Sequence, residues 1–405
     1  MRIWGCASPA VPVVPVVPVV PVVPGENILA LRDHVLYAGV PEQRALIERL
    51  RRSPRPIALF GTGIYAYVLA RFLALQGVRL EFALVDQAFK TADRLVNLPV
   101  VTMEELGEKI GTLDVVIGIT NFPAVEGRLR ACGAAGVHVI DVPDYLNMPA
   151  PFMDIGFFEA NADAFEAAHA AFADELSRQT YAASINARLN EDARLLQPVV
   201  RRDRLYFPSA EFPIGDHESF LDVGGFDGDT VLDFHSVSGG CYDAIISLEP
   251  CRGNFERLVQ RVDNARLDRV IPIRRGAWDK RETLHVAPQQ MAIDNQITAG
   301  GSESIEVDRI DAILEELKRP VTLIKLDING AEYPALCGAR NTIRNQRPNI
   351  AVRLHCKEDY YRIPLLLKDI VPDMRLLLRQ RCCMSLMVIL YGIFDRSSAR
   401  GTPTP

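Results

Sequence analysis

The sequence contains no apolar stretch long enough to form a membrane span. Its longest such run, residues 384–394, falls short of the roughly 20 residues that cross a bilayer. We interpret this run as a buried strand and expect no membrane span. Basic residues are not in excess either, since 45 Lys and Arg stand against 51 Asp and Glu, a net charge of −6. Without a basic face we expect no nucleic-acid partner.

Paired cysteines are also lacking. Eight cysteines are scattered along the chain without a Cys-x-x-Cys motif, and only Cys382 and Cys383 are adjacent. This pattern fits neither a zinc site nor the disulfide framework of a secreted protein. We therefore expect reduced thiols, a cytoplasmic location and no metal.

The first 25 residues have low complexity. A Pro-Val-Val unit repeats from Pro12 and closes at Pro24-Gly25. Proline at every third position excludes a helix and favours polyproline II, whereas the apolar region of a signal peptide is helical. We interpret residues 1–25 as an extended tail, and the Ser-, Gly- and Pro-rich residues 396–405 as a disordered one.

Strand and helix signals alternate twice along the chain, which predicts two α/β domains with parallel, doubly wound sheets. The first domain is predicted at residues 54–145, with four strands. The second is predicted at residues 206–395, with six. The alanine-rich segment between them, residues 150–205, predicts a helical connector. The predicted strands are residues 57–60, 80–85, 115–119, 137–140, 220–223, 244–248, 270–274, 322–326, 350–354 and 386–390, and the predicted helices of the first domain are residues 64–76 and 129–135.

A glycine-rich turn follows the first strand of the second domain. Glycine allows the backbone to approach a ligand closely, and nucleotide-like ligands bind at such turns. Three carboxylates in this turn would repel a phosphate but would accept from a cation such as the methionine ammonium of S-adenosylmethionine. The predicted cofactor residues here are Asp222, Gly224, Gly225, Asp227, Gly228 and Thr230, and Asp229 is the third acid.

Two further features occur at suitable distances along the chain. Glu249 ends the next strand, where an acid holds the ribose hydroxyls of a nucleotide-like ligand. After the third strand, Trp278 is a candidate to cover the adenine and Asp279 to accept from its amino group. A core tryptophan beside a Gly-Asp turn explains the last pair equally well.

At these residues the chain resembles the FkbM family of S-adenosylmethionine-dependent methyltransferases. The matching segments are residues 220–230, 248–250, 324–336 and the later His355, and the resemblance spans residues 206–394. It implies a Rossmann-like class I methyltransferase domain, S-adenosylmethionine as cofactor and Glu249 as its binding acid. It also implies O-methylation of a saccharide or secondary metabolite. The family motif Asp-x-Glu-Gly-Ala-Glu has Asn329 in place of its first glutamate here.

Methyl transfer to oxygen requires a positioned hydroxyl and the removal of its proton. Asp327 and His355 follow the fourth and fifth strands on the rim facing the cofactor. We predict His355 as general base, because the pKa of a histidine lies near neutrality. Lys325 is the third catalytic candidate, paired with Asp327 or Glu332. Glu332 alternatively caps the following helix. A magnesium site at Asp327 and Asn329 is disfavoured, because only one of the two is anionic.

The first domain carries a dinucleotide-type fingerprint. Gly61 and Gly63 follow a strand and open a helix, and Asp86 comes about 20 residues after them. We predict a second nucleotide or nucleotide-sugar site there. A fold used only for packing or dimerisation explains the pattern equally well.

The sequence as a whole predicts an S-adenosylmethionine-dependent O-methyltransferase that acts on a small-molecule or saccharide acceptor. Homo-oligomerisation is left open. One alternative is a catalytically silent scaffold or nucleotide-sugar-binding protein with a methyltransferase fold, which Asn329 favours. A second alternative is an NAD-linked oxidoreductase that uses the first domain.

Overall fold

The computed structural model describes residues 30–37, 39, 41–145, 148, 152–212, 214–287, 296–297 and 301–394. Both predicted tails lie outside these residues. The described part contains a six-stranded, a seven-stranded and a small four-stranded sheet. None of its helices combines the length and the hydrophobicity needed to cross a membrane.

The six-stranded sheet has the order β3-β4-β2-β1-β5-β6. Its strands are parallel except for the β3–β4 pair. The prediction of four strands was wrong, because β3 and β4 are a short, partly exposed pair that carries Pro99 and little apolar periodicity. The strands are β1 Ile57–Phe60, β2 Phe82–Val85, β3 Arg94–Leu95, β4 Leu98–Thr102, β5 Asp114–Ile117 and β6 Gly136–Val139.

The helices of this part cover the six-stranded sheet. The helix predicted at residues 129–135 in fact begins earlier and ends at Ala131. Pro123 suits the first turn of a helix, and Gly133, with φ of +83°, follows its end. The helices are α2 Glu42–Arg51, α3 Ile64–Leu75, α4 Met103–Leu106 and α5 Phe122–Ala131, with 3₁₀ turns η1 Gln87–Phe89 and η2 Gly107–Thr112.

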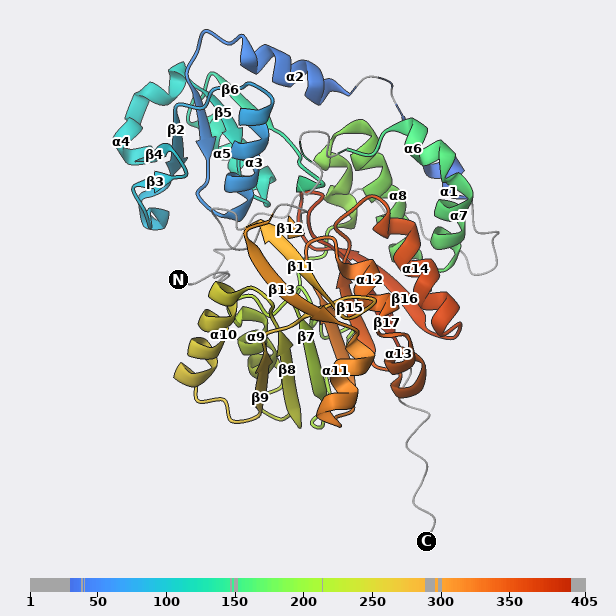
Figure 1. Cartoon of the computed structure of the whole chain (residues 1–405). Coiled ribbons are helices and arrows are strands. Elements are labelled where there is room, and N and C mark those ends of the chain that lie inside the picture. Colours follow the sequence, from blue (N-terminus) through green and yellow to red (C-terminus); the bar gives the residue numbers. More distant parts are fainter. Residues whose placement is uncertain are drawn as a thin grey trace.

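The segment between the two large sheets in the sequence folds into a layer of helices (Figure 1). Aspartates cap two of its helices, Asp154 at α6 and Asp174 at α8. Helix α7 packs on α14, and α8 packs on β16. The layer comprises α6 Ile155–Ala160, α7 Ala162–Ala170, α8 Glu175–Asn190 and η4 Ala193–Val199, and the N-terminal α1 Leu31–His34 joins it at α7.

The seven-stranded sheet has the order β16-β17-β15-β14-β7-β8-β9, in which β17 alone runs antiparallel to its neighbours. Each of the six predicted strands overlaps one of its members, and the doubly wound α/β fold class is confirmed. The unpredicted seventh strand is β16. The strands are β7 Ser219–Val223, β8 Ala244–Leu248, β9 Val270–Ile273, β14 Leu323–Leu326, β15 Asn349–Arg353, β16 Arg375–Gln380 and β17 Val388–Ile393.

Helices flank this sheet, and a small sheet that was not predicted is inserted after β9. Its strands are β10 Gly276–Ala277, β11 Glu282–Ala287, β12 Gln296–Ile297 and β13 Glu303–Asp308. The helices are α9 Asp229–Val237, α10 Arg252–Asn264, α11 Ile310–Leu317, α12 Glu332–Cys337, α13 Arg340–Gln346 and α14 Asp359–Ile370.

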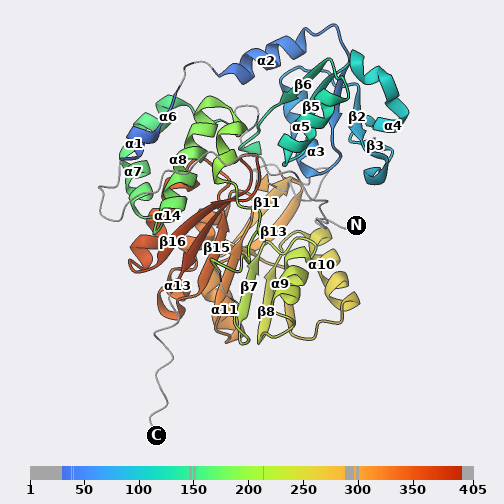
Figure 2. The same cartoon turned by 180° about the vertical axis from the view of Figure 1, so that it is seen from behind.

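The loop between β16 and β17, residues 381–387, joins the two large sheets. Its Cys383, Met384 and Leu386 belong to the buried cluster of the first domain. The Cys383 amide donates to the Thr120 carbonyl (3.1 Å), and the Ser385 amide donates to a carboxylate oxygen of Asp141 (3.1 Å). The first domain therefore contacts the seven-stranded sheet through this loop, and the two opposite views show it above that sheet (Figures 1 and 2).

Candidate active site

The predicted glycine turn connects β7 to α9. Gly224 has φ of +87°, and a Cβ atom there would lie 2.2 Å from the Asp327 carbonyl oxygen. A Cβ atom on Gly225 would lie 2.2 Å from Ser247 Oγ, and Gly228 again has φ of +87°. Only glycine fits these positions, because β7 packs closely against β8 and the end of β14. The turn thus lies at the carboxyl edge of the sheet, between the ends of β14 and β8, the two neighbours of β7.

The acids of the turn differ in their partners. Asp222 is fully buried, 3.0 Å from Lys325 Nζ, and accepts from Ser247 Oγ (3.0 Å). Asp227 accepts from Arg261 (2.6 Å), and Asp229 Oδ1 accepts from the Thr230 amide (2.7 Å). Asp222 therefore contacts the neighbouring strands β14 and β8, which support the turn, whereas Asp227 and Asp229 lie in the turn itself.

Lys325 does not pair with Asp327 or Glu332, and that expectation was wrong. Lys325 and Asp222 are direct partners in the β14–β7 register, so their side chains share a face. The ammonium also donates to the Gly224 carbonyl (2.7 Å) and lies over the Tyr206 ring. Lys325 thus binds the backbone of the glycine turn.

Glu249 lies directly beside the turn, as predicted from its position after β8. One oxygen accepts from the Phe226 amide (3.0 Å) and the other from the Cys251 amide (2.9 Å). Burial raises the pKa of this carboxyl to about 7, against the lowering effect of these hydrogen bonds.

The turn also offers an unsatisfied acceptor. Within the described part of the chain, no hydrogen-bond donor reaches Asp227 Oδ1, although this atom is buried. A buried acceptor without a donor costs free energy, and a cationic ligand supplies that donor. The hydrogen-bond acceptors at this edge therefore fit a ligand that carries both an ammonium group and ribose hydroxyls.

Trp278 and Asp279 directly follow β10, in the segment that leads to β11 of the small sheet. Trp278 packs against the cluster formed by Cys251, Val286, Ile305 and Val307, and its amide donates to the Asp308 carbonyl (2.8 Å). Because Cys251 is two residues after Glu249, the indole lies next to the Glu249 edge. Asp279 is exposed.

Asp327, His355 and Glu332 come together at the ends of β14 and β15. His355 Nε2 lies 3.2 Å from Asp327 Oδ1, and His355 Nδ1 lies 2.8 Å from Glu332 Oε1. Neither ring nitrogen is aligned for a hydrogen bond to any described residue. Glu332 accepts from the amides of Ile328 (2.7 Å) and Gly330 (2.8 Å), which fixes its carboxylate at the start of α12.

The other Asp327 oxygen is held by a second pair of groups. The Tyr206 hydroxyl donates to Asp327 Oδ2, and Arg353 Nη1 lies 3.4 Å from the same atom. Burial alone would raise the Asp327 pKa, but Arg353 and His355 hold it well below its usual range. Asp327 is therefore ionised at neutral pH.

The pKa of His355 is higher than the near-neutral value that the sequence prediction assumed. Burial lowers it, but the charge of Glu332 and the contact with Asp327 outweigh burial and raise it to about 9. At pH 7 the free imidazole therefore carries a proton. His355 can accept a proton from a substrate only after losing this one, so its role as general base stays a prediction.

Tyr145 and Asn329 complete this edge, and the sequence did not point to Tyr145. The Tyr145 hydroxyl donates to Asn329 Oδ1 (2.6 Å), and its ring meets the His355 ring edge-on with centroids 6.4 Å apart. Asn329 takes a φ of +53°, which asparagine tolerates well. Tyr145 follows β6 of the first domain, 184 residues before Asn329, and no local signal in the sequence joins the two.

At the predicted second nucleotide site, Gly61 has φ of +121° and its Cβ position lies 2.8 Å from the Gly118 carbonyl oxygen. This glycine serves packing between β1 and the end of β5. Asp86 pairs with Arg128 (2.9 Å), while Gly63 has open space beside it. The loop of residues 381–387 occupies the neighbouring ends of β5 and β6 through Thr120 and Asp141.

The strand order and the glycine turn define a class I methyltransferase fold. Residues 222–382 match the family model described as the methyltransferase FkbM domain. No curated protein matches the chain.

The chain is also similar to solved structures of methyltransferases. The methyltransferase FkbM from Methylobacillus flagellatus KT is 20% identical with a TM-score of 0.61, and the match covers 88% of this chain and 94% of that one. Fibrillarin from Aeropyrum pernix, solved with natively bound S-adenosyl-L-methionine, is 13% identical with a TM-score of 0.32 and coverage of 50% and 73%. An rRNA methylase from Streptococcus thermophilus is 10% identical with a TM-score of 0.29 and coverage of 45% and 90%.

Proposed function

We propose that this protein is an S-adenosylmethionine-dependent O-methyltransferase that acts on a hydroxyl of a saccharide or secondary metabolite. The observation that carries the proposal is Glu249, a buried carboxylate beside the tightly packed glycine turn of β7. Glu249 would accept from the ribose hydroxyls, and Asp227 Oδ1 from the methionine ammonium. Trp278 would lie beside the adenine.

The acceptor would lie over the ends of β14 and β15. Bound S-adenosylmethionine supplies an electrophilic methyl group at its sulfonium. Asp327 would orient the acceptor hydroxyl, and Tyr206 and Arg353 would hold Asp327 in place. Tyr145 would close the acceptor side from the first domain.

Isothermal titration of the purified full chain with S-adenosylhomocysteine tests the cofactor half of this proposal. We expect one molecule bound per chain, and loss of binding in Glu249→Ala. A dissociation constant of about 1 mM already corresponds to weak binding at a specific site. If the wild type shows no binding at this ligand concentration, the proposal is rejected. Transfer of a tritiated methyl group from S-adenosylmethionine to a panel of saccharides and hydroxylated metabolites tests the acceptor half.

A catalytically silent scaffold remains the second candidate, and Asn329 in place of the family's glutamate favours it. Cofactor binding without transfer to any member of the panel would support it. The division into residues 54–145, 150–205 and 206–395, the cytoplasmic location and any homo-oligomer belong to the same proposal. For the Gly61, Gly63 and Asp86 site we favour a packing role over a nucleotide, because Asp86 is engaged by Arg128.

A further inference from the structure

The ring of His355 has an unusual environment at the acceptor edge. It is 4% exposed, and neither nitrogen is aligned for a hydrogen bond to a described residue, although carboxylate oxygens lie 2.8 and 3.2 Å away. A hydrogen bond at these distances would direct a nitrogen at its oxygen. Once it loses a proton, the imidazole has a lone pair on one nitrogen, and two ligands of the same cation lie about 3 Å apart, as a ring nitrogen and its neighbouring carboxylate oxygen do here.

Asp327, Glu332 and His355 each offer one ligand atom, and the three atoms lie within 4.8 Å of one another. Three atoms at that spacing surround a point about 2.8 Å from each, so small side-chain rotations reach the bond lengths of about 2.0–2.2 Å that metals require. We propose that these residues form a binding site for one divalent metal ion. The proposal departs from the sequence-based expectation of no metal.

The groups around the three ligands resemble the supporting contacts of a metal site. Tyr206 and Arg353 hold Asp327 Oδ2, which leaves Asp327 Oδ1 facing His355 Nε2. The amides of Ile328 and Gly330 fix Glu332. Such outer contacts orient ligands before the ion arrives. By contrast, Asn329, the residue first considered as a ligand, accepts from Tyr145.

The ligand set indicates the kind of ion. Two carboxylates and one imidazole suit Mn²⁺ or Zn²⁺ better than Mg²⁺, which is bound mainly by oxygen ligands. Asp359 adds a third buried carboxyl next to His355, through its hydrogen bonds from the His355 and Cys356 amides. Among the described residues, Arg353 is a guanidinium that contacts one of the three ligands, Asp327.

This inference rests on the proposed function for its purpose, because a bound dication lowers the pKa of a coordinated hydroxyl. The site itself is tested without an acceptor. The full chain is stripped with EDTA and titrated with MnCl₂, and the loss of the free Mn²⁺ signal is followed by electron paramagnetic resonance. We expect one Mn²⁺ per chain, with affinity reduced at least tenfold in Asp327→Asn and in His355→Gln.

His169→Gln is the matched control, because His169 is also buried but lies on α7 beside Tyr181, away from this edge. It should bind Mn²⁺ like the wild type. Circular dichroism checks that each variant folds, and Glu332→Gln, which keeps the acceptor for the Ile328 amide, replaces any variant that does not. The inference fails if the wild type shows no saturable binding at about 1 mM Mn²⁺, or if the site variants bind as the wild type does.

S-adenosylhomocysteine titration of the EDTA-treated samples separates this inference from the proposed function. Mn²⁺ binding without cofactor binding would keep the metal site and reject the methyltransferase activity. Cofactor binding without Mn²⁺ binding would reject the metal site alone, and His355 would then be a buried imidazolium held between two carboxylates.

Discussion

Glu249 is the single side chain on which cofactor binding depends most directly. It is buried between the glycine turn and the start of α10, with amides of Phe226 and Cys251 donating to its two oxygens. Its pKa of about 7 places its ionisation within the range that solution experiments reach easily. A neutral glutamine of the same shape removes the charge and leaves the packing.

We predict that cofactor affinity rises with pH through neutrality. Ribose hydroxyls donate to the ionised carboxylate, so below pH 7 binding must first remove a proton from Glu249. S-adenosylhomocysteine should bind about tenfold more weakly at pH 6 than at pH 8, and the dependence should level off above pH 8. Isothermal titration measures this, and Glu249→Gln should bind weakly at both values. A wild-type affinity that does not change with pH would show that another group carries the ribose contact.

The second prediction at the scale of one residue concerns the effect of Gly224→Ala on folding stability. Gly224→Ala combines a positive φ with a Cβ atom 2.2 Å from the Asp327 carbonyl oxygen, so it should destabilise the fold by about 3 kcal/mol or more. Gly133→Ala is the control, because Gly133 has φ of +83° but open space, and should cost about 1–2 kcal/mol. Urea unfolding compares the two. Equal costs would mean that the turn relaxes away from β14.

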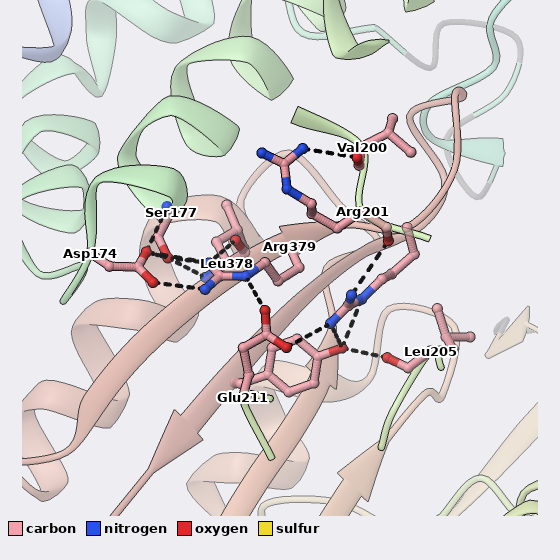
Figure 3. Close-up of polar contacts among 10 residues, drawn as sticks. Asp174, Ser177, Val200, Arg201, Leu205, Glu211, Leu378 and Arg379 are labelled. Atoms are coloured by element: carbon pink, nitrogen blue, oxygen red, sulfur yellow. Dashed lines mark hydrogen bonds and ion pairs between the residues drawn. The ribbon is translucent and has the colours of Figure 1, made fainter. Parts of the chain in front are cut away.

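At the scale of elements, arginine contacts hold β16 in place. Its sequence, RLLLRQ, contains arginines on both sides of a short apolar run, and for this reason it was not predicted as a strand. Arg379 on β16 bonds Asp174 (2.7 Å) and Glu211 (2.8 Å), as Figure 3 shows. Arg381, directly after β16, donates to the Tyr391 hydroxyl (2.9 Å). The Ser177 hydroxyl at the start of α8 accepts from Arg379 (2.9 Å). These contacts fasten the helical layer and the segment before β7 to the edge of the seven-stranded sheet.

Arg379→Met should therefore cost roughly 2–4 kcal/mol of folding stability, because it leaves Asp174 without its cation and Glu211 with only Arg381, 4.0 Å away. Arg340→Met breaks the exposed Arg340–Asp369 pair and should cost about 0–1 kcal/mol. Urea unfolding of both variants measures the difference. A loss for Arg379→Met no larger than the control's would show that β16 is held by packing alone.

The same contrast explains which elements the sequence could predict. Buried parallel strands such as β7, β8 and β14 are short apolar runs followed by glycine or an acid, and these were predicted within one or two residues. In the small sheet, β10 and β12 are two residues long, and β11 and β13 mix polar with apolar residues. At the site, strand ends predicted that Asp327 and His355 lie together, but cross-strand register decided that Lys325 pairs with Asp222.

At the scale of the whole molecule, the first domain contributes to the core and to the candidate active site. Tyr145 reaches Asn329, and Asp141 binds Ser385 in the loop of residues 381–387. Met384 in that loop is fully buried in the first domain's cluster. Such contacts join residues more than 180 positions apart, so no pattern in the sequence reveals them. The two sheets therefore share apolar core, and their stabilities should be coupled.

Calorimetry tests this coupling. Leu73 is buried in the first domain on α3, and Leu73→Ala should cost about 2–5 kcal/mol. If the domains unfold together, the wild type shows one transition, and Leu73→Ala moves all of it to lower temperature. Met384→Ala removes the shared side chain and should separate the transition into two, because each sheet then keeps mainly its own core. If the wild type already shows two transitions, and Leu73→Ala moves only one, the first domain is an independent module and Tyr145 would reach the site by domain docking alone.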